Sequence, residues 1–153
     1  MKRGSKFGVW GVHAARGLGA LVGLGLIAGA AGAEDSPKNL ECSFTGGTSW
    51  SYDAGVYNSK APSPLSFSIE EIDLDQQKAT LKTGADAKGG KLSVVRAINA
   101  NHFLEAVNEG FLNLTTVYDK DPHLGKYPAV HSRHFGLLGQ PVFGQYTGFC
   151  TDK

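Results

Sequence analysis

Short β-rich segments separated by turn residues recur from residue 40 to the end of the chain, and this pattern constrains the fold most strongly. Leu65, Phe67 and Ile69 alternate with serines, which is typical of a strand with one buried face. The β-rich segments lie at 40–45, 48–52, 65–69, 78–83, 91–97, 102–108, 111–118, 129–138 and 142–149. Their spacing, with turn residues between them, predicts an all-β antiparallel meander of about eight strands.

Residues 1–33 have the order of a secretory signal peptide. An apolar run without charge at 18–31 follows a basic region and ends in small residues. The basic residues are Lys2, Arg3, Lys6 and Arg16. The apolar run is shorter than the roughly 20 residues that a membrane-spanning helix needs. We therefore predict cleavage near Ala33, a flexible lead-in at 34–39 and a single barrel domain at 40–153, with no membrane span in the mature chain.

The two cysteines, Cys42 and Cys150, bracket nearly all of the β-rich segments. An even number of cysteines in an exported chain favours a disulfide. A bridge between the first and last strands would make those strands neighbours, so we predict a closed or nearly closed small barrel. Closing a loop of about 100 residues restricts the unfolded chain by about 4–5 kcal/mol in the chain-entropy model.

Removal of the leader changes the sign of the net charge. The whole chain has 15 Lys+Arg and 14 Asp+Glu, so 11 basic and 14 acidic residues remain without the leader, a net charge of −3. A weakly acidic domain without a basic, aromatic stripe lacks the electrostatic features of a nucleic-acid-binding protein. We expect no nucleic-acid partner.

The segment at 102–109 permits two interpretations. Asn101 could cap two turns of helix that end before Gly110. A clear strand follows this segment directly, however, and Asn108-Glu109-Gly110 suits a hairpin turn. We therefore expect a strand.

Four segments resemble a family of small secreted bacterial proteins whose function is uncharacterised. They are HFLE at 102–105, LTTVY at 114–118 after Gly110, VHSRHF at 130–135 and QYTGFC at 145–150. The resemblance covers most of the C-terminal half and, less clearly, 42–52. It implies a periplasmic or secreted bacterial protein, and it implies no activity and no catalytic residues.

The last hairpin carries the candidate ligand-binding residues. A tight turn at Gly139-Gln140 would place Arg133 opposite Tyr146 and His131 opposite Gly148. Side chains alternate along a strand, so one face of this hairpin collects these groups. The candidate residues on that face are His131, Arg133, Gly144, Tyr146 and Gly148.

The chemistry of this face suits an anion or a carbonyl ligand. Arg133 offers a planar fork of donors, His131 an imidazole that titrates near neutral pH, and Tyr146 a hydroxyl. Two glycines on the same face would leave an open strip of backbone that a ligand could approach. The alternative is a structural cluster, in which Arg133 stacks on Tyr146 and the glycines mark bends of the barrel.

Other chemistry has weaker support. The candidate metal ligands are His102, Glu105, His123, His131 and His134. None of them has the HExxH or CxxC spacing of a metal site, so we expect neither a metal nor a cofactor. Ser132 lies between two histidines but outside any G-x-S-x-G motif. We assign no catalytic residues from these patterns.

Two functions are therefore considered. The first is a non-catalytic binding module of the cell envelope, whose partner is a small molecule or an envelope protein. The second is a small enzyme that uses His131, Arg133 and Tyr146. A deep pocket with a strongly shifted pKa of His131 would favour the enzyme. A filled interior would favour binding or a structural role.

Overall fold

The computed structural model describes residues 36–84, 88–107, 110–137 and 139–153. The predicted signal peptide at 1–33 lies outside these residues. The strands are β1 (Leu40–Asp53), β2 (Val56–Lys60), β3 (Leu65–Asp73), β4 (Lys78–Lys82), β5 (Gly90–Arg96), β6 (Ala100–Val107), β7 (Phe111–Tyr118), β8 (Tyr127–Leu137) and β9 (Gln140–Asp152). In the described ranges, no helix is long and apolar enough to cross a membrane.

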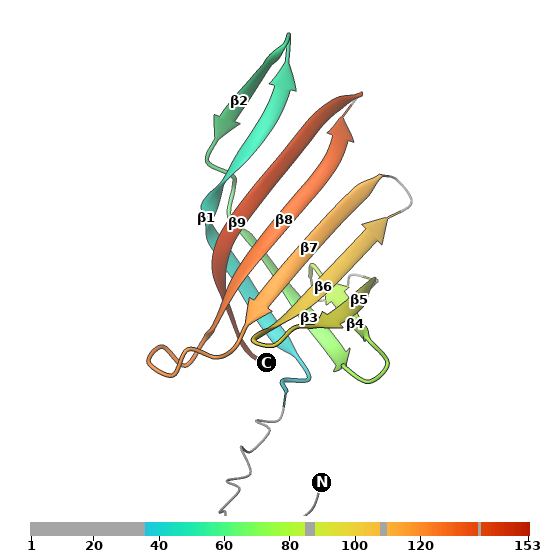
Figure 1. Ribbon diagram of the computed structural model, residues 1–153, viewed down its shortest axis with the longest axis vertical. Coiled ribbons are helices and arrows are strands. Elements are labelled where there is room, and N and C mark those ends of the chain that lie inside the picture. The colour runs from blue at the N-terminus through green and yellow to red at the C-terminus, as the bar shows by residue number, and fades with distance from the viewer. Residues whose placement is uncertain (1–35, 85–87, 108–109, 138) are drawn as a thin grey trace, which may run out of the picture. The chain divides into compact units, whose positions relative to one another are not determined.

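The strands form one antiparallel barrel (Figure 1). Their order is β2-β1-β3-β4-β5-β6-β7-β8-β9, and the pairing of β1 with β9 closes eight of them into a ring. β2 is an additional strand that pairs with the second half of β1. The predicted closed all-β barrel is confirmed.

The disulfide between Cys42 and Cys150 is also confirmed. The two cysteines are direct partners on β1 and β9, with a Cα–Cα distance of 4.0 Å, and both are fully buried. The covalent bond therefore fastens the two terminal strands at the seam of the barrel.

The expectation that Gly46-Gly47 separates two strands is wrong. β1 runs through both glycines, and its register against β9 shifts by one residue between Phe44 and Gly46. Gly47 has a φ of 136°, and a Cβ there would lie 2.9 Å from the Cα of Tyr146. The glycines thus form a β-bulge at which β1 passes close to β9 and exchanges its partner β3 for β2.

β2 does not appear among the strands predicted from sequence. All five of its residues are exposed, so they lack the buried alternation by which the other strands are recognised. A two-residue turn joins β1 to β2, because Asp53 pairs with Val56. Ala54 and Gly55 both have a positive φ, 46° and 88°, which is the signature of a type I′ turn.

The strand interpretation of the segment that begins at His102 is confirmed. β6 extends from Ala100 to Val107 and pairs with β7 along its whole length. Residues 108 and 109 lie outside the described residues. The long cross-strand pairing outweighs the local capping chemistry at Asn101, as expected when a segment has strand neighbours on both sides.

The register predicted for the last hairpin is wrong by two residues. Leu137 pairs with Gln140, so the turn is centred one residue earlier than predicted, and Gly139 there has a φ of 83°. Moving the centre of a hairpin turn by one residue shifts the pairing by two and leaves every side chain on its original face. His131 therefore lies opposite Tyr146, and Arg133 opposite Gly144.

The apolar core fills the end of the barrel that carries the two chain ends of the domain. It contains Leu40, Cys42, Phe44, Phe67, Ile69, Ile72, Ala79, Leu92, Val94, Phe103, Val117, Ala129 and Cys150. The opposite end carries the β1–β2 turn, the ends of β6 and β8 and the starts of β7 and β9 (Figure 1). We call this opposite end the hairpin end.

Candidate ligand-binding site

Backbone pairing arranges the inward-facing residues of neighbouring strands in rows across the barrel wall. One row consists of Glu105 on β6, Asn113 on β7, Arg133 on β8, Gly144 on β9 and Ser49 on β1, each the Cα partner of the next. We call it the polar row. On β6 to β9 its members alternate in phase with the buried core residues of the same strands, so they face the inside of the barrel. Ser49 joins this face because the bulge in β1 changes the phase by one residue.

His131 lies one row closer to the core than Arg133. Phe103, Thr115 and His131 in this row are only 1%, 4% and 5% exposed. Thr115 Oγ1 and His131 Nδ1 share a hydrogen bond of 2.9 Å. The rings around the imidazole are those of Phe44, Phe67 and Tyr146, with centroid distances of 5.7, 5.2 and 5.8 Å.

This enclosure determines the protonation of His131. Burial, and to a lesser extent the positive charge of Arg133, lower the pKa of His131 from 6.5 to about 4. The imidazole is therefore neutral at pH 7. It is a satisfied core side chain beneath the polar row, because one ring nitrogen has a hydroxyl partner and aromatic rings surround it.

Arg133 is half-buried and faces the inside of the barrel. Among the described residues, no hydrogen bond or ion pair joins its guanidinium group to another side chain, and the stacking on Tyr146 of the alternative interpretation is not found. Arg133 lies opposite Gly144, so the partner strand β9 has no side chain that Arg133 could contact at this point. The fork of donors is thus held inside the wall without a protein acceptor.

Glu105 and Asn113 complete the polar row and were not identified as ligand-binding residues from the sequence. Asn113 Nδ2 donates a hydrogen bond of 2.7 Å to Glu105 Oε2. Asn113 Oδ1 is buried and has no partner among the described residues. The signal was present in the sequence, because a hairpin turn at 108–110 sets Glu105 directly opposite Asn113.

Above the polar row, the wall becomes apolar at the hairpin end. The rings of Phe111 on β7 and Phe135 on β8 stack with centroids 5.4 Å apart, and Val142 on β9 is the Cα partner of Phe135. A cavity of about 210 Å³ lies at this level. It is lined by Ser49, Trp50, Ser51, Lys60, Phe135 and Val142. Side chains here are half-buried or exposed, so solvent reaches the inner wall from the hairpin end.

The two candidate glycines have different surroundings. A Cβ at Gly148 would overlap the carbonyl oxygen of Ser43 and lie 2.7 Å from the Cα of Phe44. The space at Gly148 is therefore filled by the backbone of β1, and the expected open strip does not exist there. A Cβ at Gly144 would make ordinary contacts of 3.4 Å with Ser49 and Tyr146, so this glycine leaves only a small gap beside Arg133.

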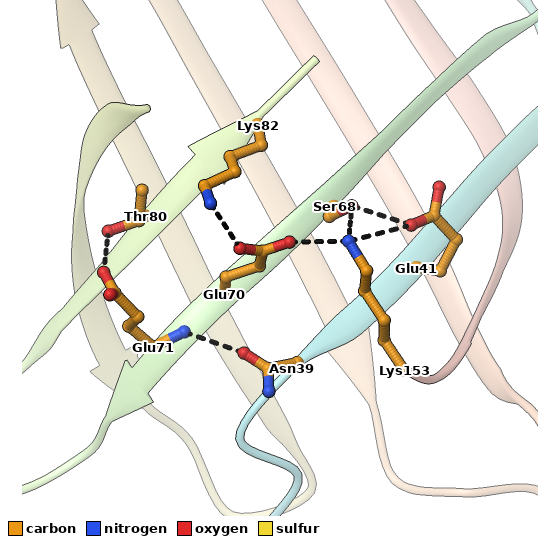
Figure 2. Close-up of polar contacts among 8 residues, drawn as sticks. All are labelled: Asn39, Glu41, Ser68, Glu70, Glu71, Thr80, Lys82 and Lys153. Atoms are coloured by element: carbon orange, nitrogen blue, oxygen red, sulfur yellow. Dashed lines mark hydrogen bonds and ion pairs between the residues drawn. The ribbon is translucent and has the colours of Figure 1, made fainter. Parts of the chain in front are cut away.

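A second polar cluster lies on the outer face of β1, β3 and β4 (Figure 2). Glu70 contacts Lys153 Nζ at 2.6 Å and Lys82 Nζ at 2.8 Å, and Ser68 donates to Glu41 at 2.7 Å. The hydrogen bonds from Lys153 and Lys82 hold the pKa of Glu70 below its usual value. Each charged group of this cluster already forms an ion pair with a group of opposite charge, so the cluster links neighbouring strands.

The same view shows how residues of the lead-in are held (Figure 2). The side chain of Asn39 accepts a hydrogen bond of 3.1 Å from the backbone N–H of Glu71, and Glu71 in turn accepts one of 2.8 Å from Thr80. Glu71 has a positive φ of 54° at an irregularity of β3. The hydrogen bond that Asn39 accepts therefore supports a bend of the strand.

The candidate metal ligands are distributed over both faces of the wall. His102 shares a 2.9 Å hydrogen bond with Thr116, and His134 stacks on Phe143 at 6.4 Å, both on the outside, whereas His131 faces inward. In the part of the chain that the structure describes, no three His, Cys, Asp or Glu residues are close enough to hold a metal ion.

Comparison of the chain with protein-family models, curated proteins and solved structures found no match.

Proposed function

We propose that this chain is an exported, non-catalytic binding protein of the bacterial cell envelope, which takes a small organic anion at the hairpin end of its barrel. Arg133 binds the anionic group, and the apolar upper wall packs against the rest of the ligand. The mouths of β-barrels are common sites for small ligands, which bind through a few polar groups in largely apolar surroundings.

The observation that carries this proposal is the state of Arg133. Arg133 is a half-buried residue, and its guanidinium group has no ion pair or hydrogen bond within the described residues. A buried charge without a partner is costly, whereas a bound carboxylate would accept two parallel hydrogen bonds from the fork. The neutral state of His131 leaves Arg133 as the positive charge beside the core.

The upper wall supports a ligand with an apolar body. Phe111 and Phe135 form a stacked pair directly above Arg133 on the inner face, and Val142 extends this surface to β9. Lys60 lines the adjoining cavity and adds a second positive charge at the hairpin end. This cavity of about 210 Å³ shares Phe135 and Val142 with the apolar surface.

The binding role is favoured over an enzymatic one by the position of His131. A general base must come within hydrogen-bond reach of the proton that it removes. His131 is 5% exposed, is bonded to Thr115 and is surrounded by rings, so its shifted pKa has a structural cause. Arg133, in contrast, offers a planar fork of donors that suits the binding of an anionic group.

Isothermal titration calorimetry with two probes, 3-phenylpropanoate and 4-methylpentanoate, tests the proposal. Arg133→Lys keeps the charge but loses the bidentate geometry, so we expect the affinity for both probes to fall by about tenfold or more. The melting temperature should change little, because Arg133 has no protein partner to lose.

The matched control is Arg96→Lys. Arg96 is an exposed arginine at the end of β5, bonded to Ser36, and its replacement should leave both affinities unchanged. If Arg133→Lys lowers the melting temperature and leaves anion binding intact, Arg133 is structural and the proposed site is wrong.

A further inference from the structure

The amide of Asn113 has only one stable orientation. Its Nδ2 donates to the carboxylate of Glu105 at 2.7 Å, and turning the amide over would bring its oxygen against that negative charge. The amide oxygen therefore has to face away from Glu105. Asn113 Oδ1 is buried and unpartnered, and the only other such side-chain oxygen in the described residues is that of Asn101, two rows closer to the core.

The absence of a side chain at Gly90 makes room for the carboxylate of Glu105. A Cβ at Gly90 on β5 would lie only 2.7 Å from Glu105 Oε1. Glu105 forms no ion pair within the described residues. The polar row thus contains a fixed negative charge and an unsatisfied acceptor on one side, and an unpaired positive charge at Arg133 on the other.

These charges are separated by a single strand. Glu105 and Arg133 are both direct partners of Asn113, so their backbones are two strand spacings apart, roughly 10 Å. Both side chains are long and extend to the same inner face. A ligand with two oppositely charged groups attached to one carbon atom can therefore contact Arg133 with its negative group and Glu105 with its positive group.

We infer that the ligand is zwitterionic, with an ammonium group beside its carboxylate, as in an α-amino acid with an apolar side chain. This inference rests on the proposed function and adds the second recognised group. The carboxylate binds Arg133, the ammonium group pairs with the carboxylate of Glu105, and the apolar side chain contacts Phe111 and Phe135. Each unpaired charge of the row then has a partner.

Matched probes that differ only in the amino group test the inference. L-Phenylalanine is compared with 3-phenylpropanoate, and L-leucine with 4-methylpentanoate, by calorimetry on the same protein. A charge-assisted pair between the ammonium group and Glu105 predicts that each amino acid binds at least about tenfold more tightly than its deaminated partner. 2-Phenylethylamine, which lacks the carboxylate, should bind more weakly than L-phenylalanine.

Glu105→Gln removes the charge and keeps an acceptor for Asn113 Nδ2. In this variant we expect each amino acid to bind about as tightly as its deaminated acid. The deaminated acids themselves should bind as tightly as they do to the wild-type protein, or more tightly. Glu41→Gln makes the same change of charge on the outer face of β1 and should keep the wild-type ratio.

The outcomes separate the two proposals. Equal or tighter binding of the deaminated acids by the wild-type protein would overturn the zwitterion inference and leave the proposed anion site in place. Loss of the preference in Glu41→Gln as well would also overturn it, since the effect would then be one of net charge. Failure of all five probes to bind would remove the proposed function itself.

Discussion

Lowering the pH should destabilise this protein through His131, whose neutral form the folded barrel favours. The pKa of His131 is lowered to about 4 in the folded state, against 6.5 for an exposed imidazole. Between these two values the unfolded chain binds more protons than the folded one, so stability falls with falling pH. The contribution is fully present above pH 6.5 and is lost as the pH falls to about 4.

The magnitude follows from the size of the pKa change. At about 1.4 kcal/mol for each tenfold change in proton affinity, the loss amounts to at most about 3.5 kcal/mol. The groups that face the imidazole are Thr115, Tyr146, two phenylalanine rings and Arg133. None of these groups is a carboxylate, and the positive charge of Arg133 opposes protonation.

Urea unfolding at closely spaced pH values from 7.5 to 4 measures this effect. The double variant His131→Phe with Thr115→Val replaces the bonded pair by apolar groups of similar shape, which is close to neutral for a hydrogen-bonded pair. It should lack the part of the pH dependence that His131 causes. His123→Gln, at an exposed histidine in the β7–β8 connection, controls for the loss of one imidazole. If the double variant loses stability between pH 6.5 and 4 as steeply as the wild type, the reasoning is refuted.

Three further predictions concern the barrel itself. Cys150→Ala should lower the free energy of unfolding by roughly 2–5 kcal/mol in chemical denaturation, because it removes a cross-link over 108 residues; an unchanged midpoint would contradict this. Gly148→Ala should cost about 3 kcal/mol or more, since its Cβ overlaps the Ser43 carbonyl, whereas Gly136→Ala, with open surroundings, should cost far less. Ala54→Asn should raise the free energy of unfolding by about 0.5–1 kcal/mol, and with it the melting temperature, because asparagine tolerates the positive φ of this type I′ turn better than alanine. A lower melting temperature would count against the assigned turn.

Local patterns were sufficient for the class of fold. Alternation of apolar and polar residues defined most of the strands, since a strand with one buried face needs that period. The two cysteines near the ends of the domain then indicated which strands meet. Alternation also identified the correct face of the last hairpin, because an error of two residues in the register leaves each side chain on the same side.

The tertiary structure alone decided which groups share a row. A row depends on the register of several strands at once, and alternation cannot distinguish registers that differ by two. The sequence therefore predicted Tyr146 opposite Arg133, where the barrel places Gly144, and it did not bring Glu105 and Asn113 to the same site.

Closure of the barrel decided the rest. Gly46 and Gly47 have the composition of a turn, but the approach of β9 makes them a bulge within β1. Gly148 offers open backbone on an isolated hairpin, but β1 covers it once the ring is closed. The sequence by itself determined most of the strands and their faces, because alternation depends on neighbours along the chain, and its two cysteines indicated the cross-link. The polar row around Arg133 arises only when strands distant in sequence pack side by side.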